Sequence, residues 1–400
     1  MQIIVFSHPL FMNSQSMPRF TNLLVTGMQS RGHEVEVWSP APKLWTLTEQ
    51  ASLKKWFGYV DQYILFPIQV RRKLKKMSQK TLFVFADNAL GPWVPLVADR
   101  PHVMHCHDFL AQQSGLGKIP ENPTSFTGQL YQAFIRRGYR QAQNFVSVSA
   151  KTRRDLHELL TKKPLLSEVI YNGLNRQFIT GDVCKARVTL SHHIRLDLSE
   201  GYLFHIGGNQ WYKNRLGVIK LYNAWRSQTI QPIPLLMIGE KPDEALLQER
   251  ILSAYQQDIH FITGLNDEAI RLAYQGGSLF IFPSLNEGFG WPIAEAMASG
   301  CLVLTTAEDP MREVAGDAGY TLPRMPFEKL SQLNWAQTGA QAIESLLSLP
   351  KKQKEATVKR GLTNVEQFDT NSFYTQIEAV YQQIITHYST THPNTHIYVN

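Results

Sequence analysis

The chain has 400 residues, of which 43% are hydrophobic, and a formal net charge of +7. This length suits two globular domains better than one. Its three cysteines, Cys106, Cys184 and Cys301, lack metal-ligand or disulfide spacing, which favours a reducing compartment and excludes a zinc-binding or disulfide-rich module. No run of eighteen apolar residues predicts a membrane span, and no leader precedes the first apolar run, so we expect a cytoplasmic protein.

The first half of the chain alternates short apolar runs with helical segments. A helix is expected over roughly 18–31, between the first two runs. Strands separated by helices predict an α/β, doubly wound parallel sheet. The predicted strands are 3–6, 34–38, 82–85, 102–106, 145–148 and 169–171.

Residues 51–80 carry eight basic residues against a single acid, Asp61, so their net charge of +7 equals that of the whole chain. The same segment is rich in aromatic residues, including Trp56, Tyr59 and Tyr63. Basic and aromatic residues together suit an anionic membrane surface or another anionic partner. The alternative is a solvated basic helix that packs on its domain through the aromatics. Under the first interpretation the protein is peripheral on the inner membrane face.

A second series of apolar runs begins near residue 200 and predicts a second Rossmann-like unit. We expect an N-terminal domain over 1–185, a C-terminal domain over 186–370, a final helix over 371–388 and a frayed tail over 389–400. The predicted strands of the second series are 202–206, 235–238, 260–262, 279–282 and 302–305.

The most informative motif runs from Pro283 to Gly300 and contains Glu287 and Glu295. It reads as a strand, a glycine loop and a helix, so Glu287 lies where the strand ends and Glu295 lies in the helix. Open α/β sheets hold ligands at strand ends, and the N–H groups at a helix start favour an anion. The motif therefore predicts a site for an anionic ligand.

This string resembles the donor-site signature of the retaining glycosyltransferases of family 4. The resemblance implies the GT-B fold, in which two Rossmann-like domains face a central cleft and the last helix crosses back to the first domain. It also implies that Glu287 faces the transferred sugar and that Glu295 binds the ribose. Backbone amides of Gly288, Phe289 and Gly290 would bind the sugar.

A second stretch, 204–215, also resembles the family. Lys213 and Asn214 match its Lys-Asn pair, and Lys213 would offset the charge of the leaving diphosphate. The family usually has an arginine where this chain has Gly208; Arg215, or the helix after Gly290, can compensate. The other donor-binding residues that the resemblance implies are Gly207 and Asn209, with Gly239 and Leu265 near the base.

In the first domain, His107 follows a predicted strand, and the family often has a histidine there that contacts the donor sugar. The first loop, 8–18, lacks the family's glycines. Its polar residues Asn13, Ser14 and Ser16, together with Asp108, are the acceptor-side candidates.

The sequence thus predicts a retaining, metal-independent glycosyltransferase with Glu287, Lys213 and His107 in catalytic roles. The donor is expected to be a nucleotide-diphosphate sugar, UDP- or GDP-linked, and the acceptor to be a hydroxyl of a glycan, a lipid-linked molecule or a small molecule. No cofactor, metal or nucleic acid is expected. Two alternatives stay open: a nucleotide-sugar binding protein with weakened catalysis, and a GT-B sugar-nucleotide epimerase.

Overall fold

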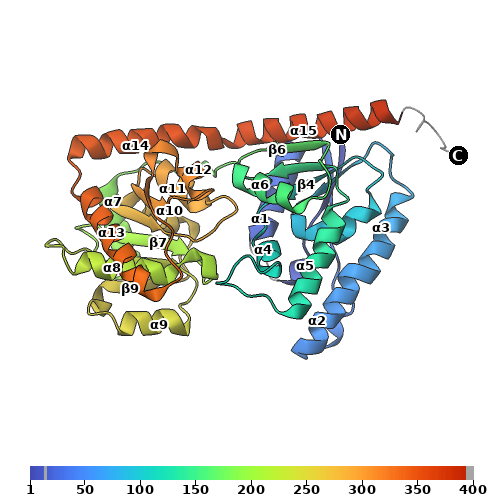
Figure 1. Ribbon diagram of the computed structural model, residues 1–400. Helices are drawn as coiled ribbons and strands as arrows, with labels where there is room; N and C mark the ends of the chain where they lie inside the picture. The colour runs from blue at the N-terminus through green and yellow to red at the C-terminus, as the bar shows by residue number, and fades with distance from the viewer. Residues whose placement is uncertain (13–15, 393–400) are drawn as a thin grey trace. The chain divides into compact units, whose positions relative to one another are not determined.

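The computed structural model describes residues 1–12 and 16–392 (Figure 1). The chain divides into two compact units, Met1–Tyr171 with Asn371–Asn400, and Asn172–Thr370. The expected boundary at residue 185 is therefore too late. Residues 172–185 belong to the second unit, where helix α7 (Val183–Ile194) packs against α10 (Asp267–Gly276).

The first unit contains a six-stranded parallel sheet in the order β2-β1-β3-β4-β5-β6, which confirms the predicted doubly wound sheet. The chain starts in the middle of this sheet and builds outward in both directions, so the strand order reverses between β1 and β3. The strands are β1 Gln2–Phe6, β2 Glu34–Trp38, β3 Leu82–Phe85, β4 His102–Cys106, β5 Asn144–Ser147 and β6 Leu166–Val169.

Alternating residues of β1 enter two separate cores, as the period of a strand requires. Ile3 and Val5 face α1 (Ser16–Ser30) and α15 (Thr370–Thr391), both of which cover one side of the sheet (Figure 1). Phe6 points to the opposite side and stacks on Phe85, with the ring centroids 4.8 Å apart. The helices that cover that side are α3 (Phe66–Leu74), α5 (Phe126–Tyr139) and α6 (Ala150–Leu159).

The basic segment forms one uninterrupted helical stretch, α2 (Ala51–Val60), the π-helical turn η3 (Asp61–Leu65) and α3. Phe66 and Val70 bury one side of α3 in the core. Asp61 is also buried, and its carboxylate accepts hydrogen bonds from the backbone N–H groups of residues 43–45. This segment is therefore anchored to the first unit and is not an independent arm.

The second unit contains a parallel sheet in the order β12-β11-β10-β7-β8-β9, which reverses between β7 and β10. Helices α8 and α13 cover one side, and Tyr274 of α10 packs on Phe204 and Phe280 on the other. The elements are β7 Leu203–Gly207, α8 Arg215–Arg226, β8 Leu235–Gly239, β9 Ile259–Ile262, β10 Leu279–Phe282, α11 Trp291–Ala298, β11 Val303–Thr306, β12 Tyr320–Leu322 and α13 Lys329–Leu347.

The C-terminal helix α15 and the remaining elements complete the two units. Helix α15 belongs to the first unit from Asn371 on and ends three residues beyond the expected residue 388; of the expected tail, residues 393–400 lie outside the described part of the chain. Among the described residues, no helix combines the length and apolar character needed to cross a bilayer. The remaining elements are η1 Leu10–Met12, η2 Trp45–Leu47, η4 Asn88–Leu96, α4 Leu110–Gly115, η5 Trp211–Lys213, α9 Glu244–Ile251, η6 Gln256–Asp258, α12 Met311–Ala315, η7 Gly316–Ala318, α14 Lys351–Val365 and η8 Glu366–Phe368.

Candidate active site

The candidate site of the second unit lies where the strand order reverses between β7 and β10. Parallel strands on either side of such a reversal send their following helices to opposite faces, which leaves space for a ligand at the carboxyl ends. Lys213 comes from the loop after β7 and Glu287 from the loop after β10. Lys213 Nζ lies 2.7 Å from Glu287 Oε1, and the two side chains are only 16% and 9% exposed. The structure thus brings together two predicted catalytic residues that are 74 positions apart in the sequence.

Asn214 holds the two loops together. It adopts a left-handed backbone conformation (φ 52°) and caps α8, accepting a hydrogen bond on Oδ1 from the N–H of Gly217 at 3.2 Å. Its Nδ2 donates to the carbonyl of Pro283 at 2.9 Å. The N–H of Leu285 also donates to the carbonyl of Tyr212 at 2.7 Å. The predicted donor-binding Asn214 therefore uses its side chain to position Lys213 beside the loop that carries Glu287.

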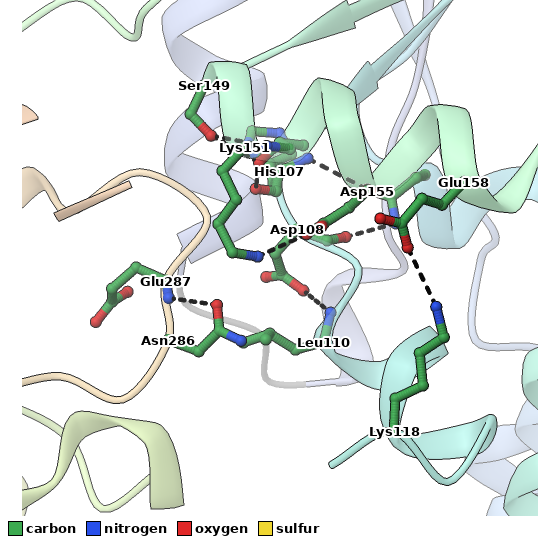
Figure 2. A network of polar contacts seen from close by, with 12 residues as sticks. His107, Asp108, Leu110, Lys118, Ser149, Lys151, Asp155, Glu158, Asn286 and Glu287 are labelled. Atoms are coloured by element: carbon green, nitrogen blue, oxygen red, sulfur yellow. Dashed lines mark hydrogen bonds and ion pairs between the residues drawn. The ribbon is translucent and has the colours of Figure 1, made fainter. Parts of the chain in front are cut away.

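Two neighbours fix Glu287 itself. Ser284 donates its hydroxyl to Oε1 at 2.8 Å. The backbone N–H of Glu287 donates to Asn286 Oδ1 at 3.0 Å (Figure 2). Oε1 thus accepts from both Ser284 and Lys213. Sequence reasoning gave Ser284 no role, although its position three residues before Glu287 was a usable signal.

The glycine loop leads directly into α11. Gly290 is the residue before the helix and has φ 108°, a conformation that side chains disfavour. Gly290, at the N-cap, has no side chain to cap this helix, so the first turn can face an anion. Phe289, in contrast, is buried and its ring packs on Phe368 at 5.3 Å, so its side chain has a structural role. Gly288 stands between Glu287 and Phe289 in this loop.

Glu295 lies on α11 and is buried. The hydroxyl of Tyr274 donates to its Oε2 at 3.0 Å. Tyr274 is on α10, 21 residues earlier, and no sequence motif identified it. The carboxylate predicted to bind a ribose is therefore held in place by a tyrosine hydroxyl.

Gly208, where the family usually has an arginine, lies in the loop after β7 beside the ends of two flexible side chains. A Cβ atom at Gly208 would lie 2.6 Å from Gln210 Oε1 and 2.9 Å from Glu240 Cδ. Glu240 accepts a hydrogen bond on Oε2 from the backbone N–H of Asn209 at 2.9 Å, and Asn209 Nδ2 donates to the carbonyl of Lys241 at 2.7 Å. Glu240 and Asn209 thus hold this loop to the loop after β8.

Arg215 lies beneath this loop and is only 4% exposed. Its Nη1 donates to Asn209 Oδ1 and to the carbonyl of Glu240. Its Nε and Nη2 are buried and have no hydrogen-bond partner among the described residues. Burial lowers the pKa of the guanidinium, opposed by the charges of Asp243 and Glu240. Because unpaired buried donors are costly, Arg215 is suited to receive an anion.

His205 lies on β7, two residues before Gly207, and is fully buried. Its Nδ1 donates to the carbonyl of Ile281 at 3.0 Å, which leaves Nε2 as a hydrogen-bond acceptor without a partner among the described residues. Burial lowers the pKa of His205 to about 3, so the ring is neutral at pH 7. His205 therefore adds no charge beside Lys213 and Arg215.

The two residues expected near the base lie at the ends of neighbouring strands. Gly239 ends β8 directly opposite Gly207, which ends β7. Leu265 is half-buried between β9 and α10. Both belong to the same carboxyl edge of the second sheet as Lys213 and Glu287. Among the described residues, no group of three or more His, Cys, Asp or Glu side chains is arranged to hold a metal ion.

In the first unit, His107 and Asp108 follow β4, as predicted. His107 is half-buried, its Nε2 donates to the carbonyl of Ala86 at 2.9 Å, and burial lowers its pKa. Asp108 turns back and accepts a hydrogen bond on Oδ1 from the N–H of Leu110 at 3.0 Å (Figure 2). Lys151 Nζ, nearby on α6, pairs with Asp155 Oδ2 at 2.6 Å (Figure 2).

Of the three acceptor-side candidates in the first loop, only Ser16 lies within the described residues. Asn13 and Ser14 lie outside the described residues, and Ser16 begins α1. Sequence reasoning missed His8 and Asp87, which form a hydrogen bond with His8 Nε2 2.7 Å from Asp87 Oδ2. Each stands two residues after a strand, β1 and β3, and this shared position was the signal that could have found them.

Comparison with known proteins identifies the family. Residues 17–178 match the family model described as glycosyltransferase family 4, and residues 191–360 match the model for glycosyl transferases group 1. The chain is 28% identical over 185 residues to O-antigen chain mannosyltransferase B from Escherichia coli, a match that covers 46% of each chain. It is also 28% identical over 144 residues to MMP alpha-(1->4)-mannosyltransferase from Mycolicibacterium hassiacum, covering 36% of this chain and 33% of that one. The alignable part of this chain thus spans half or less of the length of these relatives.

Solved structures show the same fold over nearly the whole chain. Sucrose-phosphate synthase from Thermosynechococcus elongatus matches with a TM-score of 0.70 and 15% identity, covering 97% of this chain and all of that one. HepE from Anabaena, solved with UDP and glucose, matches with a TM-score of 0.68 and 16% identity, covering 96% and 99%. With two parallel sheets and family models that match both units, the chain belongs to the group 1 glycosyltransferases of family 4 and has the GT-B fold.

Proposed function

We propose that this protein transfers a sugar from a nucleotide-diphosphate donor to an acceptor hydroxyl with retention of the anomeric configuration. The observation that carries the proposal is the Lys213–Glu287 ion pair at the strand-order reversal of the second sheet, with Glu295 held by Tyr274 on the following helix. Family membership supports the reaction class. HepE, which has the same fold, was solved with UDP and glucose, and this supports testing nucleotide sugars first.

The charges of the site suit the departure of a diphosphate. As the glycosidic bond breaks, its electron pair stays with the phosphate oxygen, and cations or dipoles at that point lower the barrier. The Lys213 ammonium has three donors, so it can bind a phosphate oxygen while it holds Glu287. Arg215 has two further nitrogen donors, Nε and Nη2, which would compensate for the missing arginine at Gly208. The start of α11 adds its dipole.

The carboxylates have separate tasks in this proposal. Glu287 orients the transferred sugar through its second oxygen, because Oε1 accepts from Lys213 and Ser284. Glu295 accepts hydrogen bonds from the ribose hydroxyls. The acceptor hydroxyl attacks the face from which the diphosphate leaves, so the configuration is retained. Protein cations stabilise the diphosphate, so no divalent metal is required.

A panel of UDP and GDP sugars tests the proposal. We expect one donor to raise the melting temperature and to be cleaved to its nucleoside diphosphate, slowly with water and faster with an acceptor. Glu287→Gln keeps the shape of the side chain and is expected to bind donor while losing most turnover. A donor that shifts the melting temperature but is never cleaved would favour the binding-protein alternative. Full turnover by Glu287→Gln would refute the role of this residue.

We further propose that the α2–η3–α3 segment binds an anionic membrane surface, where an acceptor with a lipid anchor would be found. Trp56 is 67% exposed, and Ile64 and Ile68 are also exposed one helical turn apart. Lys54 and Lys73 have acidic partners. Six exposed basic residues have no ion-pair partner among the described residues: Lys55, Arg71, Arg72, Lys75, Lys76 and Lys80.

Sedimentation with vesicles tests this surface. The protein is expected to sediment with vesicles that contain anionic lipid at low salt and to be released at high salt, because each basic residue near the bilayer contributes about 1 kcal/mol. Replacing Arg71, Arg72, Lys75 and Lys76 by Gln should abolish sedimentation without changing donor binding. If the parent protein fails to bind at low salt, the segment is a solvated helix packed by its buried side.

A further inference from the structure

The α2–η3 stretch and helix α5 of the first unit meet along a seam of aromatic rings. Tyr59 of α2 and Tyr63 of η3 both pack on Tyr131 of α5, with ring centroids 5.7 Å and 6.3 Å apart. The hydroxyls of Tyr63 and Tyr131 lie 2.6 Å apart and share a hydrogen bond. The seam therefore holds α2 and α5 side by side, as Figure 1 also shows.

Large apolar side chains are exposed on both sides of this seam. On α5, Phe126, Leu130 and Phe134 are 72%, 56% and 45% exposed. Their spacing of four residues places them on one face of the helix. On α2 and η3, the exposed apolar residues are Leu53, Trp56 and Ile64.

Ring contacts join the two sets of exposed residues into one surface. The ring of Trp56 lies 5.9 Å from that of Tyr59, and the ring of Phe134 lies 5.3 Å from that of Tyr63. Because Tyr59 and Tyr63 belong to the seam, exposed apolar side chains border it directly on both sides. An apolar surface of this kind marks an interaction site. We call it the two-helix edge; it consists of Leu53, Trp56, Ile64, Phe126, Leu130 and Phe134.

The charges beside the two-helix edge indicate its partner. Helices α2, η3, α3 and α5 contain one acidic residue, Asp61, and its side chain is buried. The exposed basic residues of these elements include Lys55, Arg71, Arg72 and Arg137. A surface that combines exposed aromatic, aliphatic and basic side chains, without acidic ones, suits the interface of an anionic bilayer.

The aromatic rings at the two-helix edge do not suit a sugar chain instead. Trp56 and Tyr59 meet edge to face with an interplanar angle of 85°, and so do Tyr63 and Phe134. A sugar ring packs on a flat, open aromatic face, whereas these rings use their faces and edges on one another. Ring geometry and charge thus both favour a bilayer over a polysaccharide.

We propose that the two-helix edge enters an anionic bilayer, with its apolar side chains among the acyl chains and the neighbouring basic residues at the headgroups. This inference rests on the membrane surface proposed for the α2–η3–α3 segment and extends it to α5. Lysine and arginine can lay their stems on an apolar surface and keep their charges in the headgroup layer. The edge adds an apolar contribution to binding, which salt does not screen.

The salt dependence of binding separates this apolar contribution from that of charge. Phe126→Gln with Leu130→Gln removes two exposed apolar side chains and no charge. Its partition into vesicles of phosphatidylcholine and phosphatidylserine, measured by sedimentation, should fall at least about 10-fold, because burying one such side chain changes a partition constant by about that factor. The factor should be the same at two salt concentrations. The factor lost on replacing Arg71 and Arg72 by Gln should shrink as the salt rises.

Leu330→Gln with Leu333→Gln is the matched control. These leucines are 79% and 69% exposed on α13 of the second unit, and the variant is expected to partition like the parent protein. An equal loss in this control would overturn the inference, because any exposed apolar pair would then have the same effect. Equal partition of the parent and the Phe126, Leu130 variant would also overturn it, while the membrane surface proposed for the α2–η3–α3 segment would stand. A parent protein that fails to bind at low salt refutes both, and the donor-cleavage assay then decides separately on sugar transfer.

A second copy of the chain is the other partner to test. Light scattering of the parent and the Phe126, Leu130 variant should give the same mass for both. A parent dimer that this variant loses would assign the two-helix edge to self-association and would overturn the inference.

A fluorescent label tests insertion at one position. Cys184 is exposed, whereas Cys106 and Cys301 are buried, so Cys184→Ser leaves no exposed native thiol. An environment-sensitive dye on Leu130→Cys in that background should shift its emission to the blue when anionic vesicles are added. The same dye on Leu330→Cys should not respond. An unshifted emission from the dye at position 130, in protein that sediments with the vesicles, would overturn the inference.

Discussion

The two strand-order reversals of this protein carry side-chain pairs of different chemistry. In the second sheet, Lys213 and Glu287 form a pair of fixed charges above the buried, neutral His205. In the first sheet, the pair is His8 and Asp87, with His8 Nε2 2.7 Å from Asp87 Oδ2. The same topology thus positions a lysine–glutamate pair in one unit and a histidine–aspartate pair in the other. In the proposed function, the charges of Lys213 and Glu287 serve the departure of a diphosphate.

The largest effect is expected from breaking the fixed-charge pair. Lys213→Met removes the cation and leaves Glu287 without its ion-pair partner, so kcat/KM should fall by roughly 10²–10³-fold. Lys220→Met is the control, because Lys220 pairs with Glu249 at 3.1 Å on the surface of the same unit. Steady-state rates with the cleaved donor measure both variants. Loss of activity to the same extent in Lys220→Met would show that folding, and not charge at the site, was disturbed.

A smaller effect is expected at the nucleotide end of the same site. Glu295→Gln removes the carboxylate predicted to accept the ribose hydroxyls, which should weaken binding of the nucleoside diphosphate by about 1–3 kcal/mol. Tyr274→Phe removes the hydroxyl that holds Glu295 and should weaken binding less, by about 1 kcal/mol. Titration calorimetry measures both. Equal affinity of parent and Glu295→Gln would contradict the ribose assignment.

The neutral state of the buried His205, next to the Lys213–Glu287 pair, can be tested through the pH dependence of stability. His205 has a pKa of about 3 when folded, against roughly 6.5 in an unfolded chain. Between these values the unfolded chain holds a proton that the folded protein lacks, so the free energy of unfolding falls as the pH falls. His205→Gln should reduce that slope by about 1.4 kcal/mol per pH unit between pH 6 and 4. Denaturant unfolding across this range measures the slope, and an unchanged slope would contradict a buried neutral His205.

The smallest effect, none, is expected from removal of divalent metal. In the proposal, Lys213, Arg215 and the start of α11 stabilise the diphosphate, so EDTA should leave turnover unchanged. Activity lost in EDTA and restored by magnesium or manganese would contradict this part of the account. The Lys213–Glu287 pair would then act together with a metal ion.

The sequence was sufficient to predict most strands, the strand-loop-helix arrangement around Glu287 and the position of Lys213, because each depends on local pattern or on a motif. It missed β12 and placed β6 at 169–171, three residues too late. The ion pair between these residues depends on strand order, which local pattern does not encode. The same holds for His8 and Asp87, whose strands are neighbours although 75 residues separate β1 from β3. Tyr274 reaches Glu295 by packing of α10 on the sheet, which only the tertiary structure reveals.

Two further features show how side-chain context decides a role. Asn214 matched a donor-site motif, yet its left-handed backbone and helix cap make it a residue that positions the loop. The domain boundary was placed too late because no change in composition marks it; the packing of α7 on α10 assigns residues 172–185 to the second unit. Both depend on contacts between residues distant in sequence.

The anomeric configuration of the transfer product tests the central proposal most directly. Proton NMR of the product, recorded before any spontaneous change of configuration, reports whether the new bond has the configuration of the donor bond. We predict that the donor's configuration is retained, and that Glu287→Gln makes the same product more slowly. A product of inverted configuration would contradict attack from the face of the leaving diphosphate and with it the roles proposed for Lys213 and Glu287.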